Sequence, residues 1–403
     1  MNFSYKFLKK NFLIYFFNFL SIIFTYILII ISFDQLDMKN FYKFTGFVAI
    51  LNIFMIPMSS ISISLSRLDF KEYINQINKI FFFFLIVTFI LILINFFSYD
   101  VLNLQDLLKL NKNDLYYLIL TIFIYSIYTL NISKFLKDRR YEAYSLNSFL
   151  PFLIRVILII CILLFYKKIN FNHILFVYIL SFLYLTYPNF TFKKQYLKFW
   201  KNNFFLKKEF FNNFLSIIII SLVLNLDILL SRSIDIKVSN EYYIASLYGK
   251  VLILSSLFVM PYIYKLSLKS AAEFHKIIIL NFLINLIILF FYFFYLQPID
   301  KIFFPKLDVD RQLVMKICSF CMIFSISFNL SNRLIIKTAK HLFIKFLFLS
   351  LCLICVYLIK NFSVGDLISL FIIISIFFFI IDLLFYLKYF SIKLNLKYQR
   401  LKF

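Results

Sequence analysis

Ionisable side chains inside long apolar segments are the residues of this sequence best suited to chemistry. Arg155 lies near the middle of one segment, and Asp227 and Lys250 lie inside two consecutive later segments. A charge at bilayer depth is costly, so it usually faces a partner or a cavity and handles charged ligands or ions. At 1.5 Å per residue, Asp227 and Lys250 lie about 10 Å below the same boundary, which predicts that they pair. Arg155 is too deep to reach a surface and is expected to face a hydrated interior.

Two interpretations of these three residues remain open. Arg155, Lys250 and Asp227 either line a cavity that binds a ligand or form structural ion pairs between helices. Four other charges lie nearer the ends of apolar segments, where reaching the membrane interface is the expected behaviour. These are Arg232, Lys316, Lys345 and Asp382.

The segments that hold these charges are long enough to cross a bilayer. Of 403 residues, 63% are hydrophobic and 15% are charged, which excludes a soluble globule. Runs of about 20 apolar residues predict transmembrane helices, so we expect an all-α integral membrane protein with about 12 spans. The predicted spans are 11–31, 44–65, 80–98, 115–133, 144–166, 172–191, 213–233, 243–264, 277–297, 312–332, 342–359 and 367–387.

Loop charges give the expected orientation. Lysines and arginines concentrate before the first span, after the fourth and after the sixth, which places those loops in the cytoplasm. The intervening loops are richer in acids and are expected outside. The tail 388–403 is basic, so both termini are predicted to be cytoplasmic, and an even number of spans follows. The first span has no small-residue cleavage site and is expected to be retained.

Nucleic acid is not an expected partner despite the formal charge of +24. The cations lie beside the spans, where each is attracted to an anionic inner leaflet by about 1 kcal/mol. Membrane lipids are therefore the expected neighbours of these charges.

The chain is predicted to divide into halves. We expect an N-terminal six-helix bundle at 1–191, a basic cytoplasmic linker at 192–212, a C-terminal six-helix bundle at 213–387 and a basic cytoplasmic tail at 388–403. The six letters Asn-Phe-Leu-Ser-Ile-Ile occur at the start of each half, from Asn18 and from Asn213. Repeated six-helix halves are typical of transporters that bind substrate between the halves.

No catalytic or metal site is expected. Cys318-x-x-Cys321 and Cys352-x-x-Cys355 have the spacing of zinc ligands, but both pairs fall inside apolar helices, where cysteine behaves as a small apolar residue. The three histidines do not cluster with carboxylates, and no phosphate-binding or nucleophile motif occurs. We therefore predict a protein that is not an enzyme and has no cofactor beyond a coupling proton or sodium ion.

One region resembles a known family. From Asn225 the chain reads Asn-Leu-Asp-Ile-Leu-Leu-Ser-Arg, followed by Tyr242-Tyr-x-Ala-Ser-x-x-Gly-Lys250 and by Met260-Pro261. This resembles the oligosaccharide flippase, or polysaccharide biosynthesis protein, family of the multidrug/oligosaccharidyl-lipid/polysaccharide exporter superfamily. The resemblance implies the fold of multidrug and toxic-compound extrusion proteins, with two six-helix bundles around a central cleft that opens to each side in turn.

The resemblance also implies a function. Such a protein moves undecaprenyl-pyrophosphate-linked oligosaccharide repeat units from the cytoplasmic to the outer leaflet of the bacterial inner membrane, for surface polysaccharide such as O-antigen or capsule. A glycan polymerase and assembly proteins are implied partners. We expect Arg155, Lys250 and Arg232 to offset the pyrophosphate charge. Arg67 is expected to meet the headgroup at the inner end of the second span, and Asp227 to bind the coupling ion.

Two other classes stay open. An extrusion antiporter of another substrate shares the architecture, although a cationic substrate would favour an acidic cleft. A membrane glycan polymerase, ligase or acyltransferase has similar hydropathy but carries its catalytic residues in a large outer loop. The longest outer loop here, 99–114, contains no His or Arg.

Overall fold

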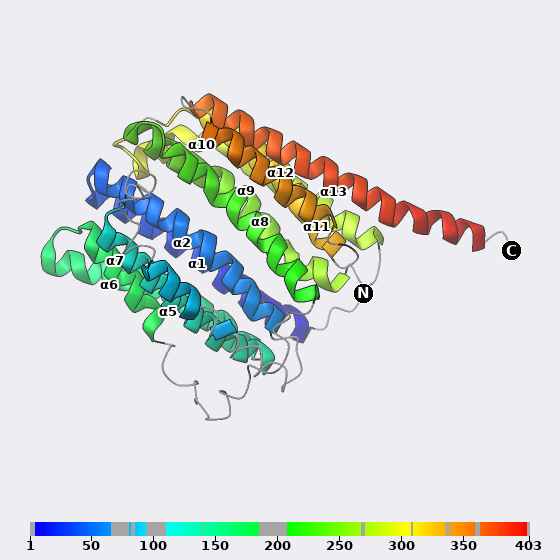
Figure 1. Ribbon diagram of the computed structural model, residues 1–403, viewed down its shortest axis with the longest axis horizontal. Coiled ribbons are helices and arrows are strands. Elements are labelled where there is room, and N and C mark those ends of the chain that lie inside the picture. The colour runs from blue at the N-terminus through cyan, green and yellow to red at the C-terminus, as the bar shows by residue number, and fades with distance from the viewer. Residues whose placement is uncertain are drawn as a thin grey trace. The chain divides into compact units, whose positions relative to one another are not determined.

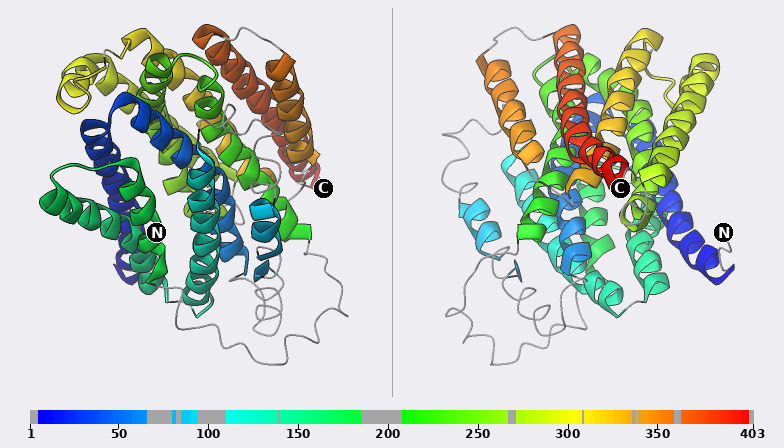
Figure 2. Two further views of the ribbon diagram at one scale, coloured as in Figure 1. Left: turned by 60° about the vertical axis from the view of Figure 1, so that its left-hand side comes forward. Right: turned by 90° about the vertical axis from the view of Figure 1, so that its right-hand side faces the viewer.

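A computed structural model gives the architecture of the chain. It describes residues 5–65, 80–81, 85–93, 110–138, 140–184, 208–266, 271–307, 309–335, 338, 340–358 and 363–400. The chain divides into two compact units, Met1–Phe210 and Phe211–Phe403. The described residues are helical apart from short turns and connections, as the views in Figure 1 and Figure 2 show. The predicted all-α class is confirmed.

Unit 1 is built from long helices and one short helix. They are α1 (Tyr5–Gln35), α2 (Met38–Leu65), α5 (Lys112–Lys137), α6 (Tyr141–Tyr166) and α7 (Phe171–Leu183). α1 packs against α6, and α2 and α7 pack against α5. In its core the ring of Phe47 on α2 meets Phe171 and Tyr178 of α7 edge to face, with centroids 6.3 and 5.4 Å apart. Large apolar side chains on one helix stripe thus bury each other within the unit.

Unit 2 contains the remaining helices. They are α8 (Lys208–Ser231), α9 (Ile236–Leu266), α10 (Ala271–Phe303), α11 (Arg311–Ile335), α12 (Lys340–Leu358) and α13 (Val364–Arg400). α11 packs against α9, α10 and α13. Its Phe320 and Phe324 meet Phe371 and Phe378 of α13 at 5.7 and 6.2 Å between ring centroids. α11 is therefore the central helix of this unit.

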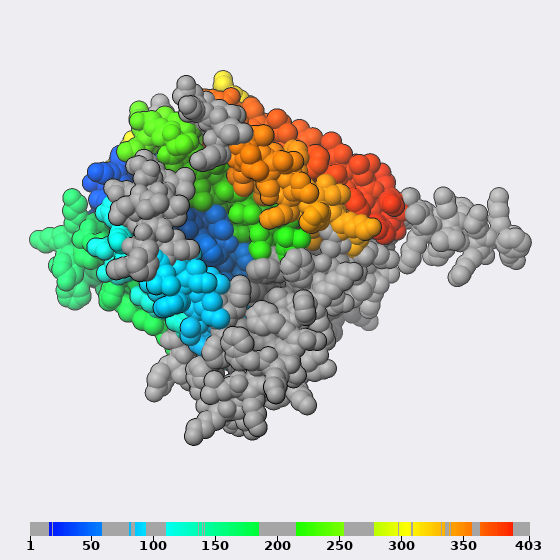
Figure 3. Space-filling model, in the orientation of Figure 1, coloured from blue at the N-terminus to red at the C-terminus, as the bar shows by residue number. Residues whose placement is uncertain are grey.

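Many outward-facing side chains are apolar, as a lipid solvent requires. Phe343, Leu347, Leu351 and Ile354 form an exposed stripe at helical spacing along α12, drawn in orange in Figure 3. Among the described residues, six helices are long and apolar enough to cross a membrane and three shorter apolar helices accompany them. These helices support a multi-pass membrane protein.

The predicted spans fall in these helices, with three differences. Only residues 80–81 and 85–93 of the predicted span 80–98 are described, and they are helical. α7 ends at Leu183, and the predicted span continued to 191, beyond the described residues. The predicted tail from 388 is a continuation of α13 to Arg400 rather than a separate segment. Residues 192–207 of the predicted linker lie outside the described part of the chain.

Candidate functional site

Each unit contains a buried charged site, and the first is built on α6. Pro151 lies inside this helix and has no N–H to donate to the carbonyl of Asn147 one turn earlier. That carbonyl accepts hydrogen bonds from the hydroxyl of Tyr128 on α5 and, at 2.8 Å, from the hydroxyl of Tyr184 after α7. Without them a backbone acceptor would be unpaired at membrane depth. The two tyrosines thus join α5, α6 and the end of α7 two turns before Arg155.

Arg155 is enclosed by aromatic rings at this junction. Its side chain is only 3% exposed, and its Nε donates a hydrogen bond to Ser181 Oγ of α7 at 3.0 Å. The guanidinium carbon lies over the rings of Tyr178 at 4.1 Å, Phe182 at 4.5 Å and Phe152 at 5.1 Å. Among the described residues, the buried Nη2 has no hydrogen-bond partner and no carboxylate pairs with the guanidinium. The site therefore holds a buried positive charge with an unused donor.

Magnitudes indicate that the rings alone do not compensate this charge. Each cation–π contact contributes about 0.5–2 kcal/mol. Burial of an ion without a counter-ion costs several kcal/mol. An anion next to Nη2 would supply the missing hydrogen bond and the missing charge. The arrangement suits binding of an anionic group.

The environment of Arg155 differs from the expected hydrated interior. The sequence correctly indicates that this residue lies deep in a helix, but the enclosing Tyr178, Ser181 and Phe182 belong to α7, a separate helix. Hydropathy of α6 alone contains no information about that neighbour.

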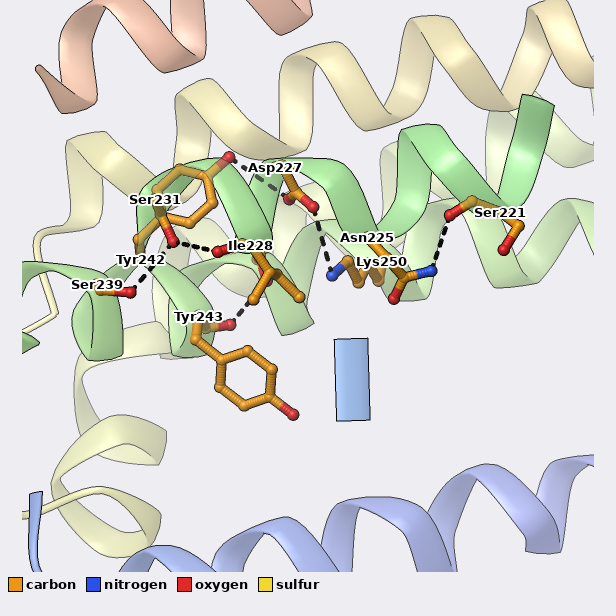
Figure 4. A network of polar contacts seen from close by, with 10 residues as sticks. Ser221, Asn225, Asp227, Ile228, Ser231, Ser239, Tyr242, Tyr243 and Lys250 are labelled. Atoms are coloured by element: carbon orange, nitrogen blue, oxygen red, sulfur yellow. Dashed lines mark hydrogen bonds and ion pairs between the residues drawn. The ribbon is translucent and has the colours of Figure 1, made fainter. Parts of the chain in front are cut away.

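The second site lies in unit 2, where α8 and α9 are joined by a short turn (Figure 4). Asp227 of α8 is 2% exposed, and its Oδ1 lies 3.7 Å from Lys250 Nζ of α9. The hydroxyl of Tyr242 donates to Asp227 Oδ2 at 3.4 Å. The predicted pairing of Asp227 with Lys250 is confirmed. The carboxylate is thus shared between an ammonium group and a phenol on the same helix.

The turn between α8 and α9 fixes this geometry. Ser231 Oγ and Ser239 Oγ lie 3.2 Å apart across it, and Asp235 caps α9 by accepting from the N–H of Lys237 at 2.8 Å. Further down α8, the Asn225 amide donates to the Ser221 carbonyl at 2.8 Å. Of the two polar residues in the Asn-x-Asp run, Asn225 therefore bonds within α8 and Asp227 faces α9.

Gly249 allows a third helix to approach this pair. A methyl group at its Cα would lie 2.7 Å from Ile317 Cγ2 and 2.8 Å from Cys321 Sγ, both on α11. Only glycine fits this α9–α11 contact without a shift. Cys321 is a buried free thiol in this contact, and Cys318 is a second buried free thiol of α11.

The remaining predicted binding residues lie elsewhere. Arg232 follows α8 directly and is one of the largest fully buried side chains, so the expectation that it reaches the interface is wrong. It sits in the turn between α8 and α9. Arg67 lies outside the described residues. Lys316 is exposed, in line with an interfacial position.

A buried ion pair was missed by the sequence reasoning. Lys345 of α12 contacts the carboxylate of Asp382 on α13, and Ser327 of α11 donates to the same carboxylate at 2.7 Å. Neither charge is interfacial, because the side chains are 4% and 0% exposed. The available signal was the presence of opposite charges at similar depth in consecutive spans. A single-helix view treats each charge separately and overlooks this.

A neutral polar layer also joins α10 and α11. Asn281 and Asn285, one turn apart, donate to Ser325 Oγ at 3.2 and 3.0 Å. All three side chains are fully buried. Such hydrogen bonds between helices satisfy polar groups that lipid cannot.

Comparison with known proteins gives the fold a context. No protein-family model matches the sequence, and no curated protein matches it. Solved structures do match. A lipid II flippase, MurJ, in its inward closed conformation has a TM-score of 0.66 at 17% identity, over 95% of this chain and 87% of that one. The chain has the fold of MurJ and of MATE transporters.

Two MATE structures support the same statement. A MATE family transporter of the MOP superfamily matches in its inward-facing conformation with a TM-score of 0.63 at 13% identity, over 92% of both chains. An outward-facing MATE structure matches with a TM-score of 0.59 at 14% identity, over 94% of both chains. At these identities the likeness shows the fold of a membrane transporter and leaves the cargo to the chemistry of the sites.

Proposed function

We propose that this chain is a flippase that moves undecaprenyl-pyrophosphate-linked oligosaccharide from the cytoplasmic to the outer leaflet by alternating access. The observation that carries the proposal is the buried guanidinium of Arg155, whose Nη2 has no partner and which no carboxylate neutralises in the described part of the chain. A pyrophosphate supplies several acceptor oxygens and at least two negative charges. The fold is shared with a flippase of a lipid-linked molecule, which supports the same class of cargo.

Each charged residue has a role in this proposal. Arg155 binds phosphate oxygens, and Lys250 binds phosphate or sugar when it leaves Asp227. Asp227, released from Lys250, takes up a coupling proton or sodium ion, so cargo and ion exchange at one carboxylate. Arg232 and Arg67 complete the basic set. A glycan polymerase and assembly proteins would receive the transferred unit.

An extrusion antiporter is the second candidate, since MATE transporters share the fold. Asp227 is the buried acid that a cationic substrate would need. However, Lys250 and Tyr242 already engage its carboxylate, which disfavours a second cation. Energy-dependent export of a cationic dye by the purified chain in vesicles would favour this candidate over the flippase.

The test uses cells that lack the chain and carry complementing variants. Mass spectrometry quantifies lipid-linked glycans, and an impermeant probe reports the leaflet that holds them. We expect complete repeat units to collect on the inner leaflet with Arg155→Gln or Lys250→Gln, and transfer to fall at least tenfold, equivalent to about 1.4 kcal/mol. Lys237→Gln, which removes a 72% exposed lysine of the same helix α9, is the matched control.

Protein amounts must be equal for the comparison to hold. If both Arg155→Gln and Lys250→Gln accumulate to the parental level and transfer glycan as well as the parent, the assignment is wrong. Truncated units in cells without the chain would instead indicate a transferase.

A further inference from the structure

A polar cavity lies at one end of unit 1, away from Arg155. The end of α1, the α6–α7 connection and the first turns of α2, α5 and α7 surround two hollows of about 330 and 250 Å³. Both hollows are lined by Asn40 and Asn170, so they adjoin. Sites for small molecules usually measure about 300–1,000 Å³, so the space suits one or two sugar rings.

Five of the twelve residues that line the two hollows, here called the amide cavity, carry side-chain amides. They are Gln35, Asn40, Asn111, Asn170 and Asn172. Asn170 is committed to the fold, since its Oδ1 caps α7 by accepting from the N–H of His173 at 2.9 Å. In the described part of the chain, the side chains of Asn40, Asn111 and Asn172 form no hydrogen bond. These three amides are available to a ligand.

The charges of the cavity balance each other. Asp114 Oδ2 lies 3.8 Å from Lys43 Nζ and accepts from the N–H of Asn111 at 2.9 Å. Asp37 caps α2 by accepting from the N–H of Asn40 at 2.7 Å. Lys168 is the second cation of the lining. The lining thus contains two lysines and two carboxylates, and both carboxylates already accept from backbone N–H groups, so the site favours neither an anion nor a cation.

Chemistry then selects the ligand class. A carboxamide both donates and accepts hydrogen bonds, as does each hydroxyl of a sugar. A neutral ligand with many hydroxyl groups satisfies several amides at once, whereas a phosphate would leave their carbonyl oxygens unpaired. We propose that the amide cavity binds the saccharide part of the cargo.

The proposal rests on the proposed function for the identity of the cargo. Loop charges predict that this end of unit 1 faces outward, because it contains the acidic loops and lies opposite the basic loop after α5. The cavity would therefore hold the sugar once it has crossed, while Arg155 serves the pyrophosphate.

Saturation-transfer NMR on the full chain in lipid nanodiscs tests the site directly. The probes are the oligosaccharide released by mild acid from the cells' lipid-linked glycan and, separately, inorganic pyrophosphate. We expect saturation transfer to the oligosaccharide, which pyrophosphate does not displace. Asn40→Leu/Asn172→Leu keeps the branched shape of the side chains but removes two amides, and should weaken binding roughly tenfold. Gln312→Leu, an exposed amide in the first turn of α11, is the control and should bind like the parent.

Three results would overturn the proposal: no transfer to the oligosaccharide with the parent, equal binding by the double variant, or displacement by pyrophosphate. The leaflet experiment separates this failure from that of the proposed function. Normal leaflet transfer without oligosaccharide binding removes only the cavity site. Oligosaccharide binding at the amides without any leaflet transfer keeps the site and removes the flippase.

Discussion

Arg155 and Lys345 are both buried cations, yet only Lys345 has an acidic partner among the described residues. Asp382 and Ser327 lie beside Lys345, and the Lys345 ammonium also lies 5.1 Å from the centroid of the Phe378 ring. This set joins three helices, and Asp382 neutralises its cation although the second carboxylate oxygen, Oδ1, has no hydrogen-bond partner. Arg155 has an unused donor and no carboxylate partner in the described part of the chain. A buried cation with its own counter-ion suits a structural role, whereas one without a counter-ion suits binding of an anion.

The Lys345–Asp382 pair should matter for stability. Asp382→Asn leaves a buried ammonium without its counter-charge, so we expect the free energy of unfolding to fall by about 3–5 kcal/mol. Lys345→Met/Asp382→Asn removes both charges at similar volume and should recover most of this loss. Thermal denaturation in detergent measures the difference.

Lys316→Met removes an exposed lysine of α11 and serves as the control for loss of a cation. A double variant as unstable as Asp382→Asn would show that the uncompensated charge is not the cause.

At the residue scale, the sequence predicted those contacts that depend only on the depth of two residues in consecutive helices. Asp227 and Lys250 lie in consecutive helices at similar depth, so their pairing followed from the 1.5 Å rise per residue. The aromatic enclosure of Arg155 depends on Tyr178 and Phe182 of α7 and required the packing of the unit. Arg232 and Lys345 were misplaced because span ends were equated with the interface.

At Gly249, α9 and α11 approach each other closely. Gly249→Ala would place a methyl group under 3 Å from two α11 side chains, Ile317 and Cys321. Overpacking of this kind costs about 1–3 kcal/mol. We expect a lower thermal midpoint in detergent, because Ile317 and Cys321 must both shift to admit the methyl group.

Gly365→Ala is the matched control. The nearest atom to its added methyl is Ser363 Oγ at 3.6 Å, an ordinary contact. Alanine also favours a helix over glycine by about 1 kcal/mol, so this variant should be unchanged or more stable. Equal losses in both variants would argue against a special α9–α11 contact.

A second link joins α9 to the end of α10. The hydroxyl of Tyr248 donates to the carboxylate of Asp300, just past the predicted span 277–297. Burial raises the pKa of the Asp300 carboxyl above its usual 3.8, and the Tyr248 hydrogen bond partly opposes this. The folded state therefore binds the proton more tightly than the unfolded state. The resulting stability is complete below about pH 4 and is lost as pH rises through the raised pKa.

Asp300→Asn should remove this dependence. We expect its thermal midpoint to match the parent near pH 4 and to exceed the parent increasingly towards pH 7, because the variant has no charge to desolvate. The measurement is the variant-minus-parent difference across that range, which cancels other titrating groups. A constant difference would mean that Asp300 is not desolvated in the folded chain.

The elements themselves were largely predictable, because apolar runs of about 20 residues have few alternatives in lipid. Helix ends were less so. α13 continues as helix through the basic tail to Arg400, where composition alone indicated a boundary. The two hydrogen bonds from Tyr128 and Tyr184 to the Asn147 carbonyl could not be predicted either. Pro151 indicates that this carbonyl lacks its helical N–H partner, but it does not identify the donors that replace it.

On the scale of the whole chain, the sequence divides into two compact units between Phe210 and Phe211. The repeated letters from Asn18 and Asn213 lie in α1 and α8, the first described helix of each unit. The likeness to MurJ extends over 95% of the chain, so both units belong to the shared fold.

Orientation is the remaining prediction, and cysteine labelling tests it for each unit separately. In a chain without its five native cysteines, Lys168→Cys and Asp235→Cys lie in loops predicted outside, and Asp138→Cys and Lys340→Cys in loops predicted inside. All four positions are exposed, so access depends on the side of the membrane. We expect an impermeant maleimide to label the first pair in intact spheroplasts and the second pair only after permeabilisation.

The two pairs distinguish specific errors. If all four variants gave the opposite labelling pattern, the orientation of the chain would be inverted. The amide cavity would then face the cytoplasm and would meet the sugar before transfer. Reversal in one unit would require an odd number of spans between Lys168 and Asp235, against the two that the sequence predicts there. A cysteine that no maleimide can reach would look like a position on the inside. Labelling of each variant with a membrane-permeant maleimide is therefore the control. Because Lys168 lines the amide cavity, labelling of Lys168→Cys from outside would place the cavity where the sugar arrives after transfer. Labelling from the cytoplasm alone would place it where the sugar first binds.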